Sequence, residues 1–165
     1  MWTWPVGIVG VALYVVVFYQ TKLYGDMGLQ VVYIILSIYG WHQWLHGGAQ
    51  RAALPVSRVT TREISILGVV AVAGAWLLGE LLYRNTDASI PYLDSALVSA
   101  SLVAQWMMTR KQLECWLVWI AADIAYVGMF FYKELYLTAF LYGVFTVLAV
   151  MGYREWKASL MSTTA

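Results

Sequence analysis

Charged residues and cysteines are scarce in this sequence. Asp, Glu, Lys and Arg make up 12% of its 165 residues, whereas a soluble domain carries about 25%. Hydrophobic residues reach 62%, and the mean hydropathy is +0.69. The composition therefore predicts an all-α protein that crosses a lipid bilayer several times. The single cysteine, Cys115, excludes an internal disulfide and a cysteine-rich metal site.

Signals of several other functions are also missing. The net charge is +1, without any block of like charges, so nucleic acid is not an expected partner. No Gly-rich phosphate loop of the GxxxxGK[ST] kind occurs, which excludes an ATPase within this polypeptide. The N-terminus MWTWPVGIVG lacks the basic region and cleavage site of a signal peptide, so the first apolar stretch should remain as a span. No cofactor is expected.

Apolar runs of about 20 residues, the length that crosses the hydrocarbon core, divide the chain. They predict six transmembrane helices, at about Trp2–Tyr24, Met27–Leu45, Ile64–Tyr83, Ile90–Thr109, Leu113–Tyr132 and Leu135–Trp156. The connections are short except for HGGAQRAALPVSRVTTRE, and no soluble domain is predicted.

Basic residues are distributed unevenly between the two sides that these spans define. One side holds Arg51, Arg58, Arg62, Arg110, Lys111, Arg154 and Lys157, and the other holds Lys22, Arg84 and Lys133. Because Lys and Arg gather in cytoplasmic loops, the first side, with both termini of the sequence, is predicted to be cytoplasmic.

An internal repeat appears when the sequence is aligned with itself so that Trp4 falls on Trp116. Without a gap, residues 4–44 and 116–156 then share 13 identities over 41 positions. These identities include Trp, Tyr, Phe and Gly, which apolar composition alone does not place at one constant offset. Helices 1 and 2 thus correspond to helices 5 and 6. A shift of four spans returns to the same orientation, so the repeats are parallel, as in one class of secondary transporters.

The same alignment predicts one helix more than the sequence contains. The mate of helix 4 would lie before Met1. The sequence therefore favours a 3+1+3 architecture with its first helix missing, through a start codon placed one helix too late; the alternative is a natural six-helix protein. The predicted domains are an incomplete first bundle at 1–48, a linker with its helix at 49–87, a second bundle at 88–158, and a cytoplasmic tail at 159–165.

Helix 5 carries one acidic residue, Asp123, near the centre of an apolar run. At 100° per residue, Trp116, Trp119 and Asp123 lie within an arc of about 60°, and Tyr126 extends the stripe. A carboxylate at the bilayer centre costs at least about 2.5 kcal/mol and needs a partner, yet no predicted helix offers Lys or Arg at that depth. An aromatic cage above a carboxylate suits a flat cationic ring; a protonated Asp bonded to a neighbouring helix is the alternative.

This W-x-x-W-x-x-x-D pattern resembles a signature of the PnuC family of bacterial vitamin transporters. The stretches WPVGIVGVALY, LYGDMGLQ, IYGWHQWLHGG, MMTRK, WLVWIAAD and YLTAFLY...MGYREW resemble family signatures in the same order. The resemblance implies a SWEET-like fold of two three-helix bundles joined by a linker helix, a homotrimer, and a place in the bacterial inner membrane with the C-terminus in the cytoplasm.

The resemblance also implies a function and a site. It implies facilitated diffusion of nicotinamide riboside, followed by trapping through a cytosolic kinase; thiamine or another vitamin is the alternative. The family motif falls on Trp116, Trp119 and Asp123. Two departures concern the substrate, because relatives often carry an amide where this sequence has Gly10 and Ser37. Ser37 is kept as a candidate substrate contact.

Other polar and aromatic residues are weaker candidates for the substrate site. Gln30, its repeat mate Tyr142, Gln105 and Tyr126 could bond an amide or a ribose hydroxyl, although an amide in hydrocarbon also finds partner helices. Asp94 is interpreted as an N-terminal helix carboxylate favoured by the macrodipole.

Three further hypotheses compete with these interpretations. His42 and His46 have the spacing of two metal ligands but no third ligand nearby, and we interpret them as interfacial anchors. An enzyme with Asp94 and Asp123 as an aspartyl dyad would need carboxylates about 3 Å apart, which their different depths exclude. A structural membrane subunit whose missing helix comes from a partner remains an alternative.

Overall fold

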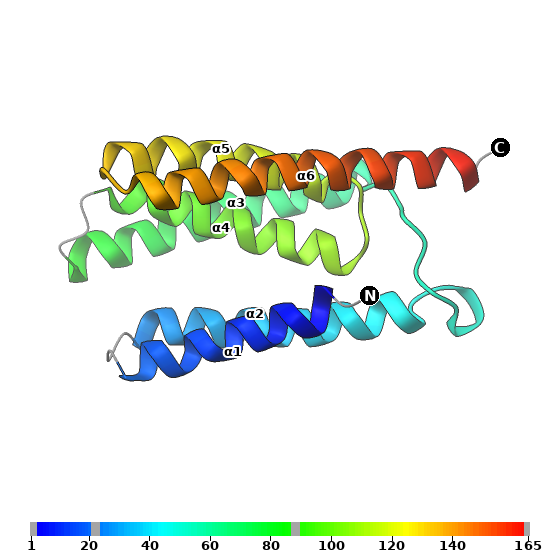
Figure 1. The fold of residues 1–165 in the computed structure, drawn as a ribbon, viewed down its shortest axis with the longest axis horizontal. Helices are drawn as coiled ribbons and strands as arrows, with labels where there is room; N and C mark the ends of the chain where they lie inside the picture. The colour runs from blue at the N-terminus through cyan, green and yellow to red at the C-terminus, as the bar shows by residue number, and fades with distance from the viewer. Residues whose placement is uncertain (1–2, 21–23, 87–89, 164–165) are drawn as a thin grey trace. The chain divides into compact units, whose positions relative to one another are not determined.

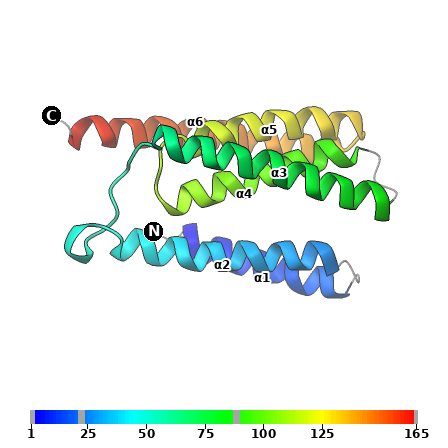
Figure 2. The ribbon, with the colours of Figure 1, turned by 180° about the vertical axis from the view of Figure 1, so that it is seen from behind.

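The protein is all-helical in a computed structural model, which describes the backbone of residues 3–20, 24–86 and 90–163 (Figures 1 and 2). Side chains are described for residues 4–16, 19–20, 29–86 and 90–162. The elements are α1 (Thr3–Gln20), α2 (Tyr24–His46), a 3₁₀ turn η1 (Ala49–Arg51), α3 (Thr61–Asn85), α4 (Pro91–Thr109), α5 (Cys115–Tyr132) and α6 (Tyr136–Thr163). They form two compact units, residues 1–55 with 108–111, and residues 56–107 with 112–165.

The first unit consists of the α1–α2 hairpin and the turn that follows α4. Trp4 of α1 packs edge-on against Trp44 of α2, with ring centroids 5.2 Å apart. The indole N–H of Trp44 donates to the carbonyl of Met108 at 2.9 Å. Lys111 donates from Nζ to the carbonyl of Leu54 at 2.8 Å, and partial burial lowers the pKa of this lysine. These contacts fix the end of α2 to the α4–α5 turn.

The second unit contains α3, α4, α5 and α6. The buried residues of α4 in this unit are Ser95, Leu97, Ser99, Ser101, Val103, Ala104 and Met107. Small residues on α4 permit close packing against α3, where the hydroxyl of Ser99 donates to the carbonyl of Ala71 at 2.8 Å. Helices α5 and α6 run side by side as an antiparallel pair (Figures 1 and 2). The α3 helix, which we expected to link two bundles, therefore belongs to this unit.

Polar residues lengthen two helices beyond their predicted ends. A capping box starts α3 at Thr61, because the Thr60 hydroxyl accepts from the N–H of Glu63 while the Glu63 carboxylate accepts from the N–H of Thr60. The last helix, α6, continues to Thr163 rather than ending at Trp156. Hydropathy marks only the apolar part of a helix, and both extensions are too polar to be read as span.

The linker before α3 is attached to the α4–α5 turn of the second unit. Glu114 accepts from the Nε of Arg58 at 3.0 Å and from the backbone N–H of Val59 at 2.9 Å. The backbone N–H of Leu113 donates to the carbonyl of Ser57 at 2.9 Å. The only long connection that we predicted is therefore held by specific hydrogen bonds at its C-terminal half.

Three helices in the described part of the chain are long and apolar enough to cross a membrane by length and composition: Thr61–Asn85, Cys115–Tyr132 and Tyr136–Ser162. A shorter apolar stretch, Trp4–Val16, lies in α1. Large apolar side chains are exposed on these helices, among them Val72, Trp76, Leu137 and Phe140, as expected where helices face lipid. The residues that the structure describes form six α-helices, the number predicted, and three of them meet the membrane criteria.

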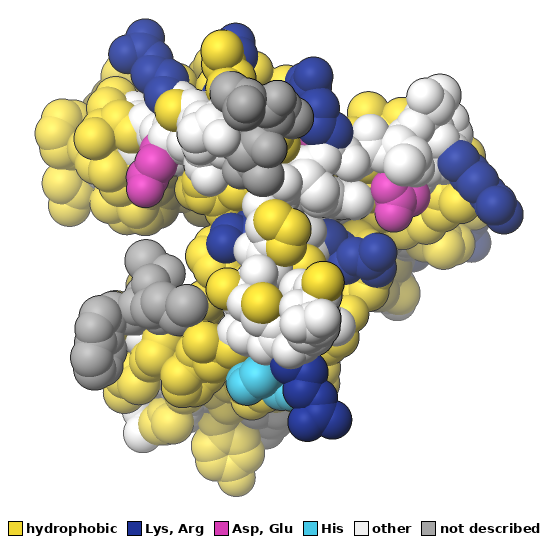
Figure 3. Space-filling model, turned by 90° about the vertical axis from the view of Figure 1, so that its right-hand side faces the viewer, with side chains coloured by type: hydrophobic (Ala, Val, Ile, Leu, Met, Phe, Trp, Pro, Cys, Tyr) yellow, Lys and Arg dark blue, Asp and Glu magenta, His cyan; other side chains and the backbone are white. Residues whose placement is uncertain are grey.

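Basic residues mark one end of the second unit. Figure 3 looks onto helix ends and shows Lys and Arg side chains spread over them, with fewer acidic ones. In the second unit, Arg58 and Arg62 precede or begin α3, and Arg154 and Lys157 lie near the end of α6. Of the residues counted on the opposite side, Lys22 lies outside the described residues.

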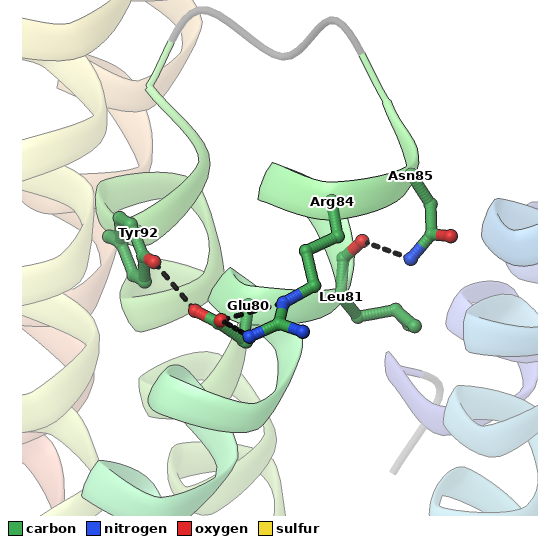
Figure 4. A network of polar contacts seen from close by, with 5 residues as sticks. All are labelled: Glu80, Leu81, Arg84, Asn85 and Tyr92. Carbon is green, nitrogen blue, oxygen red and sulfur yellow. Dashed lines mark hydrogen bonds and ion pairs between the residues drawn. The ribbon is translucent and has the colours of Figure 1, made fainter.

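A polar network ties α3 to α4 at the other end of the second unit (Figure 4). The hydroxyl of Tyr92 donates to one carboxylate oxygen of Glu80 at 2.8 Å, and the Nε of Arg84 donates to the other, also at 2.8 Å. The Asn85 amide donates to the carbonyl of Leu81 at 2.8 Å, near the end of α3. The charge of Glu80 is thus neutralised within one turn of its own helix.

Two helices end in the same tight turn, with a non-glycine residue in the left-handed region. Lys111 has φ 54° and Glu134 has φ 58°. At each turn the next residue's N–H reaches back five positions, Gln112 to Met107 and Leu135 to Phe130, which is the Schellman arrangement. Glycine is the residue that usually occupies this position, because a Cβ there costs about 1–2 kcal/mol.

We therefore predict that Glu134→Gly raises the thermal stability of the protein. Relief of the left-handed strain should exceed the extra chain entropy of glycine, for a net gain of up to about 1 kcal/mol. The measurement is thermal unfolding in detergent, with Glu134→Ala as the control because alanine keeps the Cβ. Equal melting temperatures for the two variants would contradict the strain at this turn.

Candidate functional site

One face of α5 is turned into the second unit. Its buried residues are Cys115, Ala122, Asp123 and Met129. Cys115, Ala122 and Met129 recur every seven residues, about two turns, and so lie on one face of the helix, while Asp123 follows Ala122 at the edge of that face. Asp123 is therefore buried beside this face and is not exposed on the outer surface of α5.

Asp123 is buried without a counter-ion. Its side chain is 5% exposed, and among the described residues neither an ion pair nor a hydrogen bond to it is found. A buried carboxylate without such a partner is costly, since the protein replaces none of the hydration that the charge loses. The second unit thus contains a carboxylate, that of Asp123, whose negative charge is not balanced by any described side chain.

Trp119 lies one turn before Asp123 and carries a second unsatisfied group. Its indole Nε1 is buried, and among the described residues it has no hydrogen-bond acceptor. Residues four apart on a helix have Cβ atoms about 5–6 Å apart, so a ligand could meet this donor and the Asp123 carboxylate together. An aromatic face beside a carboxylate is suited to a flat cation.

Trp116 packs against α6. Its ring meets Trp156 edge-on, with centroids 5.2 Å apart and an interplanar angle of 79°. It also lies over Gly152, where an added Cβ would come within 2.6 Å of the indole ring. Trp116 therefore lies on the same stripe as Trp119 and Asp123, and its ring packs against α6.

An aromatic cluster lies beyond Asp123 along α5 and α6. Tyr126 packs against Tyr142 with ring centroids 4.7 Å apart and stacks on Phe130 at 5.8 Å. Phe130 in turn lies 5.2 Å from Tyr142. The structure thus brings together two of the predicted candidates, Tyr126 and Tyr142, one turn from Asp123.

The remaining candidates are not joined to this face by any described contact. Gln105 is half-buried on α4 of the second unit, and Gln30 and Ser37 lie on α2 of the first unit, half-buried and buried respectively. Each unit thus contains polar groups in its interior. On α4 the Ser95 hydroxyl is also buried without a described partner.

The internal repeat separates duplicated from unduplicated positions of the stripe. Trp116 has Trp4 as its mate and Tyr126 has Tyr14, whereas the mate of Trp119 is Gly7 and the mate of Asp123 is Val11. Trp119 and Asp123 are therefore found only in the second repeat. When two repeats share one scaffold, a pair of polar groups that is present in only one repeat is expected to serve a specific function there.

Neither of the alternative chemical sites is assembled. Helices α4 and α5 are joined by a short turn. Asp94 is about seven residues further from this turn than Asp123, which is about 10 Å along the helix axis at 1.5 Å per residue. The two carboxylates therefore cannot share a proton. The rings of His42 and His46 lie 5.0 Å apart. Within the described residues, no group of three or more His, Cys, Asp or Glu could hold a metal ion.

Comparison with known proteins gives one consistent result. A family model described as nicotinamide mononucleotide transporter matches residues 1–158. The nicotinamide riboside transporter PnuC of Escherichia coli (strain K12) is 27% identical over an alignment 175 residues long. The alignment covers 91% of this chain and 73% of that protein. The riboflavin/roseoflavin transporter RibM of Streptomyces davaonensis is 28% identical over 160 residues, covering 94% of this chain and 74% of RibM.

A solved structure agrees with these matches. The crystal structure of the vitamin B3 transporter PnuC superimposes on this chain with a TM-score of 0.69 and 26% identity. The match covers 96% of this chain and 72% of the solved one. The similarity thus extends to the three-dimensional arrangement of the helices and is not confined to the W-x-x-W-x-x-x-D pattern.

We predict that Asp123→Asn raises the melting temperature of the ligand-free protein. The neutral amide avoids the cost of a buried carboxylate without a counter-ion, and a gain of about 1 kcal/mol corresponds to about 2–4 °C in a chain of this size. Asp94→Asn is the control, because a carboxylate in the first turn of α4 is favoured by the helix dipole and its loss should not stabilise. A lower melting temperature for Asp123→Asn would instead identify Asp123 as a packing residue bonded to a neighbouring helix.

Proposed function

Since the chain belongs to the PnuC family of membrane vitamin transporters, which the nicotinamide mononucleotide transporter model describes, we propose that its substrate is nicotinamide riboside. As a member of this family it is a multi-pass membrane protein and a transporter rather than an enzyme. Relatives are named for nicotinamide riboside and for riboflavin, so the choice between these vitamins depends on the chemistry of the site.

The observation that carries the proposal is that Asp123, a residue only 5% exposed and without an ion pair among the described residues, lies one turn from the buried, unpartnered indole N–H of Trp119. The nicotinamide ring of the riboside has a permanent positive charge. In the bound state this ring would supply the missing counter-ion and lie against the indole face of Trp119, through electrostatic and cation-π attraction. A neutral vitamin would leave the carboxylate without compensation.

The other polar groups are assigned to the neutral parts of the substrate. Nicotinamide riboside has a carboxamide and ribose hydroxyls, which need donors and acceptors in an apolar protein interior. We propose Tyr126 and Tyr142 in the second unit, whose rings are in contact, as further substrate-binding residues, together with Gln105. Gln30 and Ser37, which lie on α2 of the first unit, stay predictions from the sequence.

The transport mode and assembly follow the family resemblance. We propose facilitated diffusion across the bacterial inner membrane, after which a cytosolic kinase traps the substrate by adding a charged phosphate. A homotrimer is proposed on the same basis. The exposed apolar face of α3, with Val69, Val72 and Trp76, is compatible with either lipid or a second copy as its neighbour.

Riboflavin is the second candidate substrate. The similarity to RibM covers 94% of this chain, which is as extensive as the similarity to PnuC. Riboflavin is uncharged and larger, so its affinity should not depend on the charge of Asp123. The two candidates therefore make opposite predictions for one substitution.

We predict that the purified protein binds nicotinamide riboside more tightly than thiamine or riboflavin in isothermal titration calorimetry. Asp123→Asn and Trp119→Ala should each weaken binding of nicotinamide riboside by about tenfold or more, because a cation loses either its counter-ion or its aromatic face, each worth about 1–2 kcal/mol when desolvated. Asp94→Asn serves as the matched acidic control and should leave the affinity unchanged. Tightest binding of riboflavin, unaffected by Asp123→Asn, would replace the proposed substrate.

We also predict that the C-terminus lies in the cytoplasm, as the Lys and Arg distribution favours. The sole native cysteine, Cys115, is 0% exposed, so labelling can be read from single introduced cysteines in a Cys115→Ala background. An impermeant maleimide should label Lys133→Cys in intact cells, and Ser159→Cys only after the membrane is opened. The reverse order would invert the proposed orientation.

A further inference from the structure

The two units contain the same arrangement of two tryptophans and a glycine, here called the tryptophan wedge. In the first unit it consists of Trp4, Gly40 and Trp44, and in the second of their repeat mates Trp116, Gly152 and Trp156. The ring centroids of the two tryptophans lie 5.2 Å apart in both wedges, at 87° and 79°. This agreement extends the sequence repeat to side-chain geometry.

Both glycines provide the space that an indole ring occupies. A Cβ on Gly40 would come within 2.5 Å of Cη2 of Trp4, and a Cβ on Gly152 within 2.6 Å of Cη2 of Trp116. Contacts this short do not occur between real side chains, so any larger residue would push the helices apart or turn the indole. The wedge therefore fixes how closely, and in which rotation, the first helix of each pair lies against the second.

The unsatisfied N–H of Trp116 does not by itself indicate a ligand contact. Trp4 has the same feature, since its Nε1 is also buried without a described acceptor. The mates of Trp119 and Asp123 on α1 are Gly7 and Val11, so the wedge of the first unit exists without the residues proposed to bind substrate. An orphaned indole N–H at this position is a property of the wedge.

We propose that Trp116 is a positioning residue that holds α5 on α6 and does not contact the substrate. The inference rests on the proposed function for the site at Trp119 and Asp123. Trp116 lies one turn from Trp119 and two turns from Asp123 on the same stripe, so a change in its seating against Gly152 and Trp156 rotates both. The W-x-x-W-x-x-x-D pattern thus combines one packing residue with two residues that meet the vitamin.

The test is a double-substitution cycle on Trp116 and Gly152. Gly152→Ala should lower the melting temperature and weaken binding of nicotinamide riboside about tenfold, because the indole must leave its place. Trp116→Phe removes the ring atoms that the new methyl group would meet, and alone it should change the affinity by less than about threefold. The double variant should regain both stability and affinity to near the level of Trp116→Phe.

Two comparisons complete the experiment. Trp4→Phe with Gly40→Ala should show the same mutual rescue of stability, although Thr109 Cγ2 also lies 3.0 Å from the added Cβ of Gly40. Trp119→Phe, which has the same chemical change as Trp116→Phe, should weaken binding about tenfold or more without destabilising the protein. The contrast between the two Trp→Phe variants separates positioning from contact.

The outcomes are distinct. Loss of affinity in Trp116→Phe equal to that in Trp119→Phe, with no recovery of binding in the stable double variant, would overturn the proposal and make Trp116 a substrate contact. If the melting temperature of the double variant is no higher than that of Gly152→Ala, the proposed fit of the indole against glycine is wrong. If the wild-type protein does not bind nicotinamide riboside, the proposed substrate fails, while the stability cycle still decides whether the wedge fixes α5 on α6.

Discussion

Asp123 lies in the interior of a unit of largely apolar helices, and the cost of a carboxylate there constrains everything placed around it. The helices could lower this cost with a nearby lysine or arginine, or with hydrogen bonds, but the described residues do neither. By contrast, the other acidic groups described in detail are satisfied: Glu80 by Arg84 and Tyr92, Glu114 by Arg58 and Val59, and Glu63 by Thr60. Among the described residues, Asp123 thus combines burial with the lack of an ion pair or hydrogen bond, in the middle of α5.

The satisfied acids have a common structural task. Each joins a helix end to a neighbouring segment: Glu63 starts α3, Glu114 holds the linker to the α4–α5 turn, and Glu80 connects α3 with α4 (Figure 4). Exposed ion pairs contribute little to stability on their own, but here each carboxylate also accepts from a backbone N–H or a hydroxyl. These three carboxylates therefore set the direction and register of the chain at the ends of the helices.

The sequence predicted the main features of this arrangement from hydropathy and from its internal repeat. The six helices and the correspondence of α1–α2 with α5–α6 both depend on periodicity, which sequence contains directly. The extension of α6 to Thr163 and the start of α3 at Thr61 were not predicted, because polar helix ends lack an apolar signal. The bond between Glu114 and Arg58 joins residues 56 apart, and no local pattern specifies such a pair. The packing of Trp116 on Gly152 was not predicted. The repeat contains both residues as identities, but the W-x-x-W-x-x-x-D motif led us to interpret Trp116 as a binding residue.

The wedge has a consequence for how such a protein diversifies. Both halves contain the same fit of indole against glycine, which contributes to how each hairpin closes. The positions one and two turns further along the helix are then open to change in one half without loosening either hairpin. Trp119 and Asp123, whose mates are Gly7 and Val11, show such a difference between halves that share the same wedge.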